Sequence, residues 1–423
     1  MKKALNLILI SLLLVSCNEG ANKKLLKESI YIYEIKNDSY QQLSDKEYSL
    51  DSKTSDSQSI NNLIGNIKID SIKPIQSLKV KPTINKMLYS NILIDDGFIY
   101  FIDSKNNLHK RSLNSINESF KLKLDNDDSS FSTLKKRISL NNGIIIASIG
   151  SNRIYQIDTK SFKLSWSKDI SNIIRSSNVI DDKNIYISTI DNVVFAINRN
   201  NGKIKWKSEL DAKQTSIYGS GFLSDLGHNL IFTSSLGETV SLNKANGNIL
   251  WSDKTNLTNI HNSEYDMFDS ELKPIIEEKR YYNWTYAGSI ICYNSASGIR
   301  KWTLNIRPIT NLWLNGDIIY TVSEDQNIIA IDKNNGKIIW YKSLDEFRKI
   351  NSKDFQEQTI SSIFVTNNKL AILSKSGKLI FLDPIEGYYL SNERFGKNII
   401  SLPYSYSDKL YFQDHNGNIR IYH

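Results

Sequence analysis

The residue types that most often perform catalysis are sparse and scattered in this sequence. No two of its five histidines have the spacing of a zinc-ligand pair; they are His109, His228, His261, His415 and His423. No Gly-x-Ser-x-Gly elbow is present, and the glycines of Gly219–His228 lack the lysine of a phosphate-binding loop. These residues therefore predict no metal centre, no activated serine and no nucleotide site.

One cysteine is placed for a different chemistry. Two lysines precede the apolar run Leu5–Val15, which is shorter than the roughly 20 residues that a membrane-spanning helix needs. Such a start is typical of a secretory signal. The run ends in the residues Leu14–Cys17, which resemble the lipobox of bacterial lipoproteins. That resemblance implies removal of residues 1–16 and a lipid anchor on Cys17. Asn18 follows, and the absence of aspartate there is compatible with transfer to the outer membrane. An ordinary signal peptide with an incidental cysteine is the alternative.

The remaining composition excludes some functions. Cys292 has no partner cysteine once Cys17 is lipidated, so we expect a buried free thiol packed as a small hydrophobe. The net charge is +8 over 423 residues, and the two signs are interspersed. Because no dense basic run with aromatic residues stands out, nucleic acid is not an expected partner.

A nine-residue segment recurs along the chain. Aligned on their last residue, its copies end at Leu122, Trp166, Trp206, Trp251, Trp302, Trp340 and Ser391, 38 to 51 residues apart. Short runs rich in Ile, Val, Tyr and Phe lie between the copies and are separated by turn dipeptides such as Asn-Gly. Propeller blades of four strands have periods of this length. The sequence therefore predicts an all-β propeller of four-stranded antiparallel blades.

Two positions in each copy have structural roles. Gly202, Gly247, Gly298 and Gly336 lie in the tight turns, where we expect positive φ, which costs little only for glycine. Four residues after these glycines come Trp206, Trp251, Trp302 and Trp340, and Trp166 has the same place in a copy without the glycine. Since one blade cannot bury both its faces alone, we expect each tryptophan to pack against a neighbouring blade.

The end of the chain predicts how the ring closes. Lys409–His423 matches the second and third strands of a repeat, and the sequence given stops before a fourth. An unpaired strand edge is a liability, and the segment Pro74–Pro82 precedes the first full repeat. We expect residues near Ile75–Val80 to pair with the C-terminal strands. Seven full repeats and this shared one make eight blades in a domain of residues 72–423.

The residues before this domain have a different composition. Residues 17–71 are polar, charged and without a core pattern, so we expect a largely disordered tether. Within it, Ser29–Ile35 alternates apolar and polar residues and could be either a strand or a segment that binds a partner.

The Asp/Asn, Gly and Trp spacing resembles the PQQ-type propeller repeat. Together with a lipobox and a ring closed by an N-terminal strand, the sequence is similar to the BamB-like outer-membrane assembly lipoproteins over about Pro74–His423. The resemblance implies a non-catalytic scaffold without a cofactor on the periplasmic face of the outer membrane. It also implies a monomer within a larger complex that binds the POTRA domains of BamA.

The same resemblance implies two contact loops. The first is Asp211–Gly221, where Thr215, Ile217 and Tyr218 lie at the matching positions; only Ile217 fits the family pattern, and the arginine of that pattern is absent. The second carries Asp269 and Glu271 shortly before Pro274. We therefore expect Ile217, Tyr218, Asp269 and Glu271 to contact the partner. The alternative for the two acidic residues is that they are only solvated loop charges.

Two other functions use the same repeat. A quinoprotein dehydrogenase would hold PQQ over calcium, which takes six to eight oxygen ligands. The sequence offers no such set and no pair of adjacent cysteines. A generic periplasmic propeller that binds a protein or small ligand shares every feature except the two loops. In either scaffold, an unfolded outer-membrane protein could add a strand to a blade edge.

Overall fold

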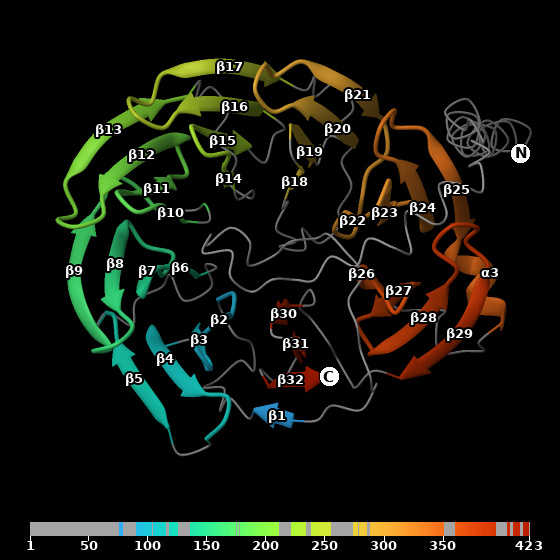
Figure 1. Ribbon diagram of the computed structural model, residues 1–423, viewed down its shortest axis with the longest axis horizontal. Coiled ribbons are helices and arrows are strands. Elements are labelled where there is room, and N and C mark those ends of the chain that lie inside the picture. The colour runs from blue at the N-terminus through green and yellow to red at the C-terminus, as the bar shows by residue number, and fades with distance from the viewer. Residues whose placement is uncertain are drawn as a thin grey trace, which may run out of the picture.

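The computed structural model describes residues 76–78 and 90–422, except for 104, 116–117, 126–135, 175, 177, 211–220, 234–237, 255–273, 278, 286–287, 351–359, 395–403, 407–408 and 415–417. These residues form eight antiparallel sheets of four strands each. The sheets are arranged around a ring, with the first strand of each innermost (Figure 1). The predicted all-β propeller of four-stranded blades is confirmed.

We number the sheets as blades 1 to 8. Blade 1 comprises β2 (Leu93–Asp95), β3 (Phe98–Ile102), β4 (Asn107–Ser112) and β5 (Ser119–Lys123). Blade 2 comprises β6 (Arg137–Asn141), β7 (Ile144–Ser148), β8 (Arg153–Asp158) and β9 (Lys163–Asp169). Blade 3 comprises β10 (Val179–Ile180), β11 (Asn184–Ser188), β12 (Val193–Asn198) and β13 (Ile204–Glu209). Blade 4 comprises β14 (Phe222–Asp225), β15 (Asn229–Thr233), β16 (Glu238–Asn243) and β17 (Ile249–Lys254).

The second half of the ring repeats this order. Blade 5 comprises β18 (Ile275–Glu277), β19 (Arg280–Thr285), β20 (Ser289–Asn294) and β21 (Arg300–Leu304). Blade 6 comprises β22 (Trp313–Asn315), β23 (Ile318–Val322), β24 (Asn327–Asp332) and β25 (Ile338–Ser343). Blade 7 comprises β26 (Ile360–Thr366), β27 (Lys369–Ser374), β28 (Lys378–Leu382) and β29 (Tyr389–Arg394). Blade 8 comprises β30 (Tyr404–Tyr406), β31 (Lys409–Gln413) and β32 (Ile419–Tyr422), with β1 (Gln76–Leu78) as its outer strand.

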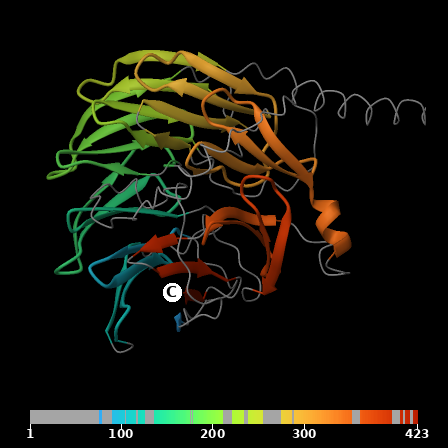
Figure 2. The same cartoon turned by 45° about the vertical axis from the view of Figure 1, so that its right-hand side comes forward.

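Blade 8 joins segments from the two ends of the described chain. β1 pairs antiparallel with β32, with Gln76 opposite Ile421 and Leu78 opposite Ile419 (Figure 1). The helix α3 (Leu344–Ile350) follows β25 and lies on the outside of the ring in Figure 2. Within the described residues, no helix has both the length and the apolar character needed to cross a membrane.

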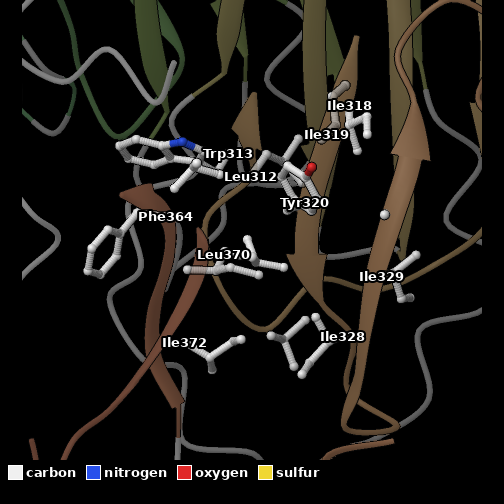
Figure 3. Packing of buried hydrophobic residues seen from close by; sticks show 14 of the residues in the cluster. Leu312, Trp313, Ile318, Ile319, Tyr320, Ile328, Ile329, Phe364, Leu370 and Ile372 are labelled. Carbon is white, nitrogen blue, oxygen red and sulfur yellow. The ribbon is translucent and has the colours of Figure 1, made fainter. Parts of the chain in front are cut away.

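The second strand of each blade is almost wholly buried. β11, β15 and β23 are near-continuous runs of buried residues, because neighbouring blades cover both faces of each sheet. The largest apolar cluster extends across blades 5 to 8. Figure 3 shows part of it, where Trp313 and Tyr320 of blade 6 lie close to Phe364 and Leu370 of blade 7. Burial between blades is thus the main source of stability in this fold.

The outer strands are half exposed and protect their free edges. In β13, β17, β21 and β25 the pairing register shifts by one residue just before the tryptophan. Such a bulge increases local twist and makes an edge a poorer template for another strand. Lysines such as Lys205 and Lys207 add charge to the same edges. The fold therefore limits pairing of its outer strands with other chains.

Side chains also fasten the inner strands to one another. The amide of Asn91 bonds both the carbonyl and the N–H of Ile138 in the next blade, at 2.8 and 3.0 Å. Asn311 makes the same pair of bonds to Ile363, at 2.9 and 3.2 Å. Because each amide satisfies a donor and an acceptor of an adjacent blade, it fixes the position of one blade against the next.

Candidate functional site

The predicted contact residues belong to two connections that border the same blade. Ile217 and Tyr218 lie in the sequence between β13 and β14, and Asp269 and Glu271 between β17 and β18; all four, like Cys17, lie outside the described residues. Strands within a blade run antiparallel. The last residues of β13 and β17 and the first residues of β14 and β18 therefore lie at one edge of the ring, which we call the loop edge. The strand ends that flank the two connections thus lie on either side of blade 4.

Polar contacts stiffen blade 4 near this edge. Arg300 of β21 donates two hydrogen bonds to Asp253 of β17, at 2.8 and 2.9 Å. These bonds raise the pKa of Arg300 above its ordinary value. The hydroxyl of Tyr293 donates to the same carboxylate at 2.6 Å. A carboxylate that accepts three such bonds is well ordered, so the end of β17 is held against blade 5 where the second connection begins.

The opposite edge of the ring carries the repeated glycines, and we call it the turn edge. Gly202, Gly247, Gly298 and Gly336 have φ of 67°, 77°, 72° and 73°. Each lies against the tryptophan of the preceding blade: Gly202 on Trp166, Gly247 on Trp206, Gly298 on Trp251 and Gly336 on Trp302. A Cβ at Gly247 or Gly336 would come within 2.6 Å of the indole ring. Only glycine lets the two blades approach this closely.

The tryptophans are held by a second contact. The indole N–H donates to the carbonyl of Arg199 from Trp166, of Lys244 from Trp206 and of Lys333 from Trp302, at 3.1, 3.0 and 2.9 Å. Trp340 donates to Pro384 in the same way at 3.2 Å. These side chains are therefore engaged in packing one blade against the next.

Sequence reasoning missed one more glycine of this set. Gly387 has φ of 72° and lies against Trp340. It stands four residues before Ser391, the spacing of the other turn glycines, so the signal was present in a repeat that lacks the tryptophan.

Sequence reasoning also missed cations that bridge neighbouring blades at the turn edge. Lys244 contacts Asp225 of its own blade at 2.7 Å and Asp181 of blade 3 at 3.0 Å. Burial alone would lower the pKa of Lys244, but the two carboxylates outweigh it and raise that pKa. Lys333 similarly contacts Asp317 of its own blade and Glu277 of blade 5. The sequence signal for these bridging cations is a basic residue directly after the Asn or Asp that ends the third strand of a blade.

The described residues offer few groups poised for a reaction. They contain no cluster of three or more His, Cys, Asp and Glu side chains that could hold a metal ion. Burial raises the pKa of the Cys292 thiol to about 11, so this thiol is protonated at neutral pH. Nε2 of His109 lies 2.8 Å from a carboxylate oxygen of Asp103, and the ring of His109 stacks on Phe101. The polar atom and the ring face of His109 therefore both make structural contacts.

Comparisons with known proteins match this architecture. The chain is 26% identical to an uncharacterised protein of Rickettsia prowazekii over 90% of its own length and 88% of that protein. It is 23% identical to the outer membrane protein assembly factor BamB of Moranella endobia, over 63% of this chain and 66% of the relative, just under two thirds of that protein's length.

Solved structures show the same fold at low identity. The crystal structure of BamB from Moraxella catarrhalis aligns with a TM-score of 0.63 and 14% identity, covering 83% of this chain and 99% of that one. A quinohemoprotein alcohol dehydrogenase from Comamonas testosteroni aligns with a TM-score of 0.61 and 10% identity, covering 94% and 84%. At such identities the likeness shows the fold alone.

The family is shown by a sequence model rather than by these structures. The model described as outer membrane protein assembly factor BamB matches residues 127–342, just over half of the chain. That match begins in the connection between β5 and β6 and ends in β25, so it includes blades 2 to 6 and both connections that border blade 4. The chain therefore belongs to the outer membrane protein assembly factor BamB family.

Proposed function

We propose that this chain is a non-catalytic scaffold subunit of the machinery that assembles outer-membrane β-barrel proteins. It is anchored by a lipid on Cys17 to the periplasmic face of the outer membrane, and residues 17–71 tether a propeller of residues 72–423. It binds the POTRA domains of BamA and supports the assembly and insertion of outer-membrane proteins. Family membership and the names of the BamB relatives support this assignment.

The placement of the two connections carries the proposal. The described strand ends that flank residues 211–220 and 255–273 lie at the loop edge on either side of blade 4, and we infer that one partner surface contacts both connections. The connection between β17 and β18 is also the longest between consecutive blades. Long connections in compact domains often have a function. Ile217 and Tyr218 supply apolar area, and Asp269 and Glu271 supply negative charge for a basic patch on the partner.

We assign the protein no reaction of its own. The tryptophans that could stack a quinone instead pack on glycines of the next blade, and four of the five donate their indole N–H to backbone carbonyls. A propeller that binds some other envelope protein or ligand is the competing proposal, and the identity of the partner separates the two.

A binding titration tests the proposal. The chain from Asn18 onward is titrated into the POTRA domains of the same organism's BamA, and the double variant Asp269→Lys, Glu271→Lys is measured alongside. We expect saturable binding that the double variant weakens about tenfold or more, as the loss of charge pairs at an interface costs a few kcal/mol.

The control variant makes an equal change of charge in a different blade. Glu386→Lys with Glu393→Lys reverses two exposed acidic residues of blade 7. This variant should bind as the unmodified chain does. If no POTRA binding is seen at high micromolar concentration, the BamA assignment is wrong and the competing proposal takes its place. If both double variants weaken binding equally, the contact is not at blade 4.

A further inference from the structure

The interface between blades 4 and 5, which we call the 4/5 seam, has more polar residues on its facing strands than the interface between blades 3 and 4. The third-strand residue opposite the tryptophan is Ala196 in β12, Cys292 in β20 and Ala330 in β24, but it is polar in β8 and β16, as Gln156 and Ser241. Two residues earlier, β16 has Thr239 where β12, β20 and β24 have Val194, Ile290 and Ile328. Blade 4 thus presents two hydroxyls to blade 5.

The facing side of blade 5 is polar as well. Asn283 is fully buried in β19, three residues after the start of the strand, where β11 has Ile187 and β15 has Phe232. Its amide nitrogen donates to the Thr239 hydroxyl at 3.1 Å. Nearby, the hydroxyls of Thr233 and Tyr281 are 2.8 Å apart. Hydrogen bonds therefore occupy space that Ile187 fills with apolar contacts in blade 3 and Phe232 in blade 4.

Three buried polar atoms of this seam have no hydrogen-bond partner among the described residues. They are Oδ1 of Asn283, Oγ of Ser241 and Nε1 of Trp251. The other four tryptophans of the set donate to the carbonyl that follows the third strand of the next blade. A buried polar group without a partner costs about 1–3 kcal/mol, so each of these atoms needs a further partner such as water.

The apolar contribution to the seam is small. Its cluster contains four buried residues, Ile231, Tyr281, Ile291 and Tyr293, whereas ten form the cluster between blades 3 and 4. The position of the bridging Lys244 and Lys333 is occupied in blade 5 by Ser295. The bidentate pair of Asp253 and Arg300 and the hydrogen bond from Tyr293 to Asp253 span the seam at the outer strand of blade 4, where the ion pair is partly exposed. Exposed ion pairs contribute about 0–1 kcal/mol.

We propose that the 4/5 seam contains ordered water bonded to these three atoms and that the ring opens there first. Internal water satisfies buried polar groups with about three hydrogen bonds each. Separating two blades costs less free energy when their seam buries less apolar surface and its polar groups are already bonded to water. The ring therefore has one preferred site of local opening, beside the blade that carries both predicted contact connections. This inference concerns the chain alone and does not depend on the proposed function.

Hydrogen exchange of the full chain tests the proposal. Opening of the seam removes the packing over β16 and β19, so their backbone hydrogen bonds break more often than those of matching strands. We expect amides of β16 and β19 to exchange at least tenfold faster than those of β12 in blade 3 and β23 in blade 6. Equal or slower exchange in β16 and β19 would overturn the proposal.

A second arm replaces the polar set. The triple variant Thr239→Val, Ser241→Ala, Asn283→Leu removes both partners of the Asn283 bond together, which avoids leaving one of them unsatisfied. Exchange of β16 and β19 should fall to the level of β12 and β23. The reciprocal variant Val194→Thr, Ala196→Ser should accelerate exchange in β12 and leave β19 unchanged. If neither variant changes the amide exchange rate at the seam where its substitutions lie, the polar residues do not determine where the ring opens.

Discussion

Gly247 shows at a single residue why the turn glycines recur. It has φ of 77°, and a Cβ there would come within 2.6 Å of the Trp206 ring. Positive φ costs a non-glycine residue about 1–2 kcal/mol, and overpacking adds about 1–3 kcal/mol. We predict that Gly247→Ala lowers the free energy of unfolding by about 2–5 kcal/mol in chemical denaturation.

The same blade offers a matched control for this prediction. Gly227 has φ of 81°, but a Cβ there would meet nothing within 4 Å. Gly227→Ala should therefore cost only the backbone strain, about 1–2 kcal/mol. Equal losses for the two variants would show that contact with the tryptophan is not the reason for glycine at 247.

We predict that the ionisation of Asp103 makes the stability of the fold depend on pH. Burial would raise its pKa, but hydrogen bonds from His109 and Asn107 outweigh burial and lower the pKa to about 2. Because the folded pKa lies below the unfolded value of about 3.9, the group stabilises the fold above that value. This contribution, on the order of 2 kcal/mol, is lost as the pH falls from about 4 toward 2.

Denaturation at pH 7, 4 and 3 checks this prediction with Asp103→Asn. At pH 7 the variant should be less stable than the unmodified chain by roughly 2 kcal/mol. The gap should narrow at pH 3, since the aspartate is then partly protonated. A gap that stays constant across this range would contradict the assigned shift.

At the scale of the element, we predict that strand β1 is needed for the stability of the ring. It is the outer strand of blade 8 and pairs with β32 over Gln76–Leu78. Deleting residues 74–82 should expose the edge of β32 and destabilise the whole ring, because the blades are packed in a closed series. Thermal unfolding measures the effect, and deletion of nine residues from the tether, 46–54, is the control. Equal unfolding temperatures for the two deletions would show that β1 does not close the ring.

The elements themselves were largely predictable from the sequence. The recurrence of Gly-x-x-x-Trp marks a repeated turn and strand, and a period near 40 residues is specific for a four-stranded blade. The fastening amides Asn91 and Asn311 were not predictable, because the chain is rich in asparagine and their partners lie about 50 residues away. The bridging Lys244 was missed for the same reason: one of its carboxylates belongs to another blade.

The candidate site was predictable only in part. The two connections could be selected from their resemblance to the family pattern, and the strand topology places their ends beside blade 4. The polar set of the 4/5 seam could not be selected, since Thr239, Ser241 and Asn283 become distinctive only after the strands are superposed by register. Threonine, serine and asparagine also occur singly in many other strands, so their presence in the sequence does not mark this seam.

At the scale of the whole molecule, the anchor determines where the propeller works. We predict that Cys17→Ala moves the protein from the membrane fraction to the soluble periplasmic fraction, because acylation needs the thiol. Fractionation of cells followed by immunoblotting measures this. Gly20→Ala, a change three residues farther along the tether, should leave the protein in the membrane fraction. Membrane association that survives Cys17→Ala would mean that another anchor exists.

Site-specific photo-crosslinking in intact cells tests the central claim most directly. A photoreactive residue is placed at 217 or at 269, beside blade 4, and at the exposed position 386 of blade 7 as the control. The account predicts an adduct with BamA from 217 and from 269, and none from 386. Failure to capture BamA from either of the first two positions, or equal capture from all three, would contradict the assignment of the partner surface to blade 4.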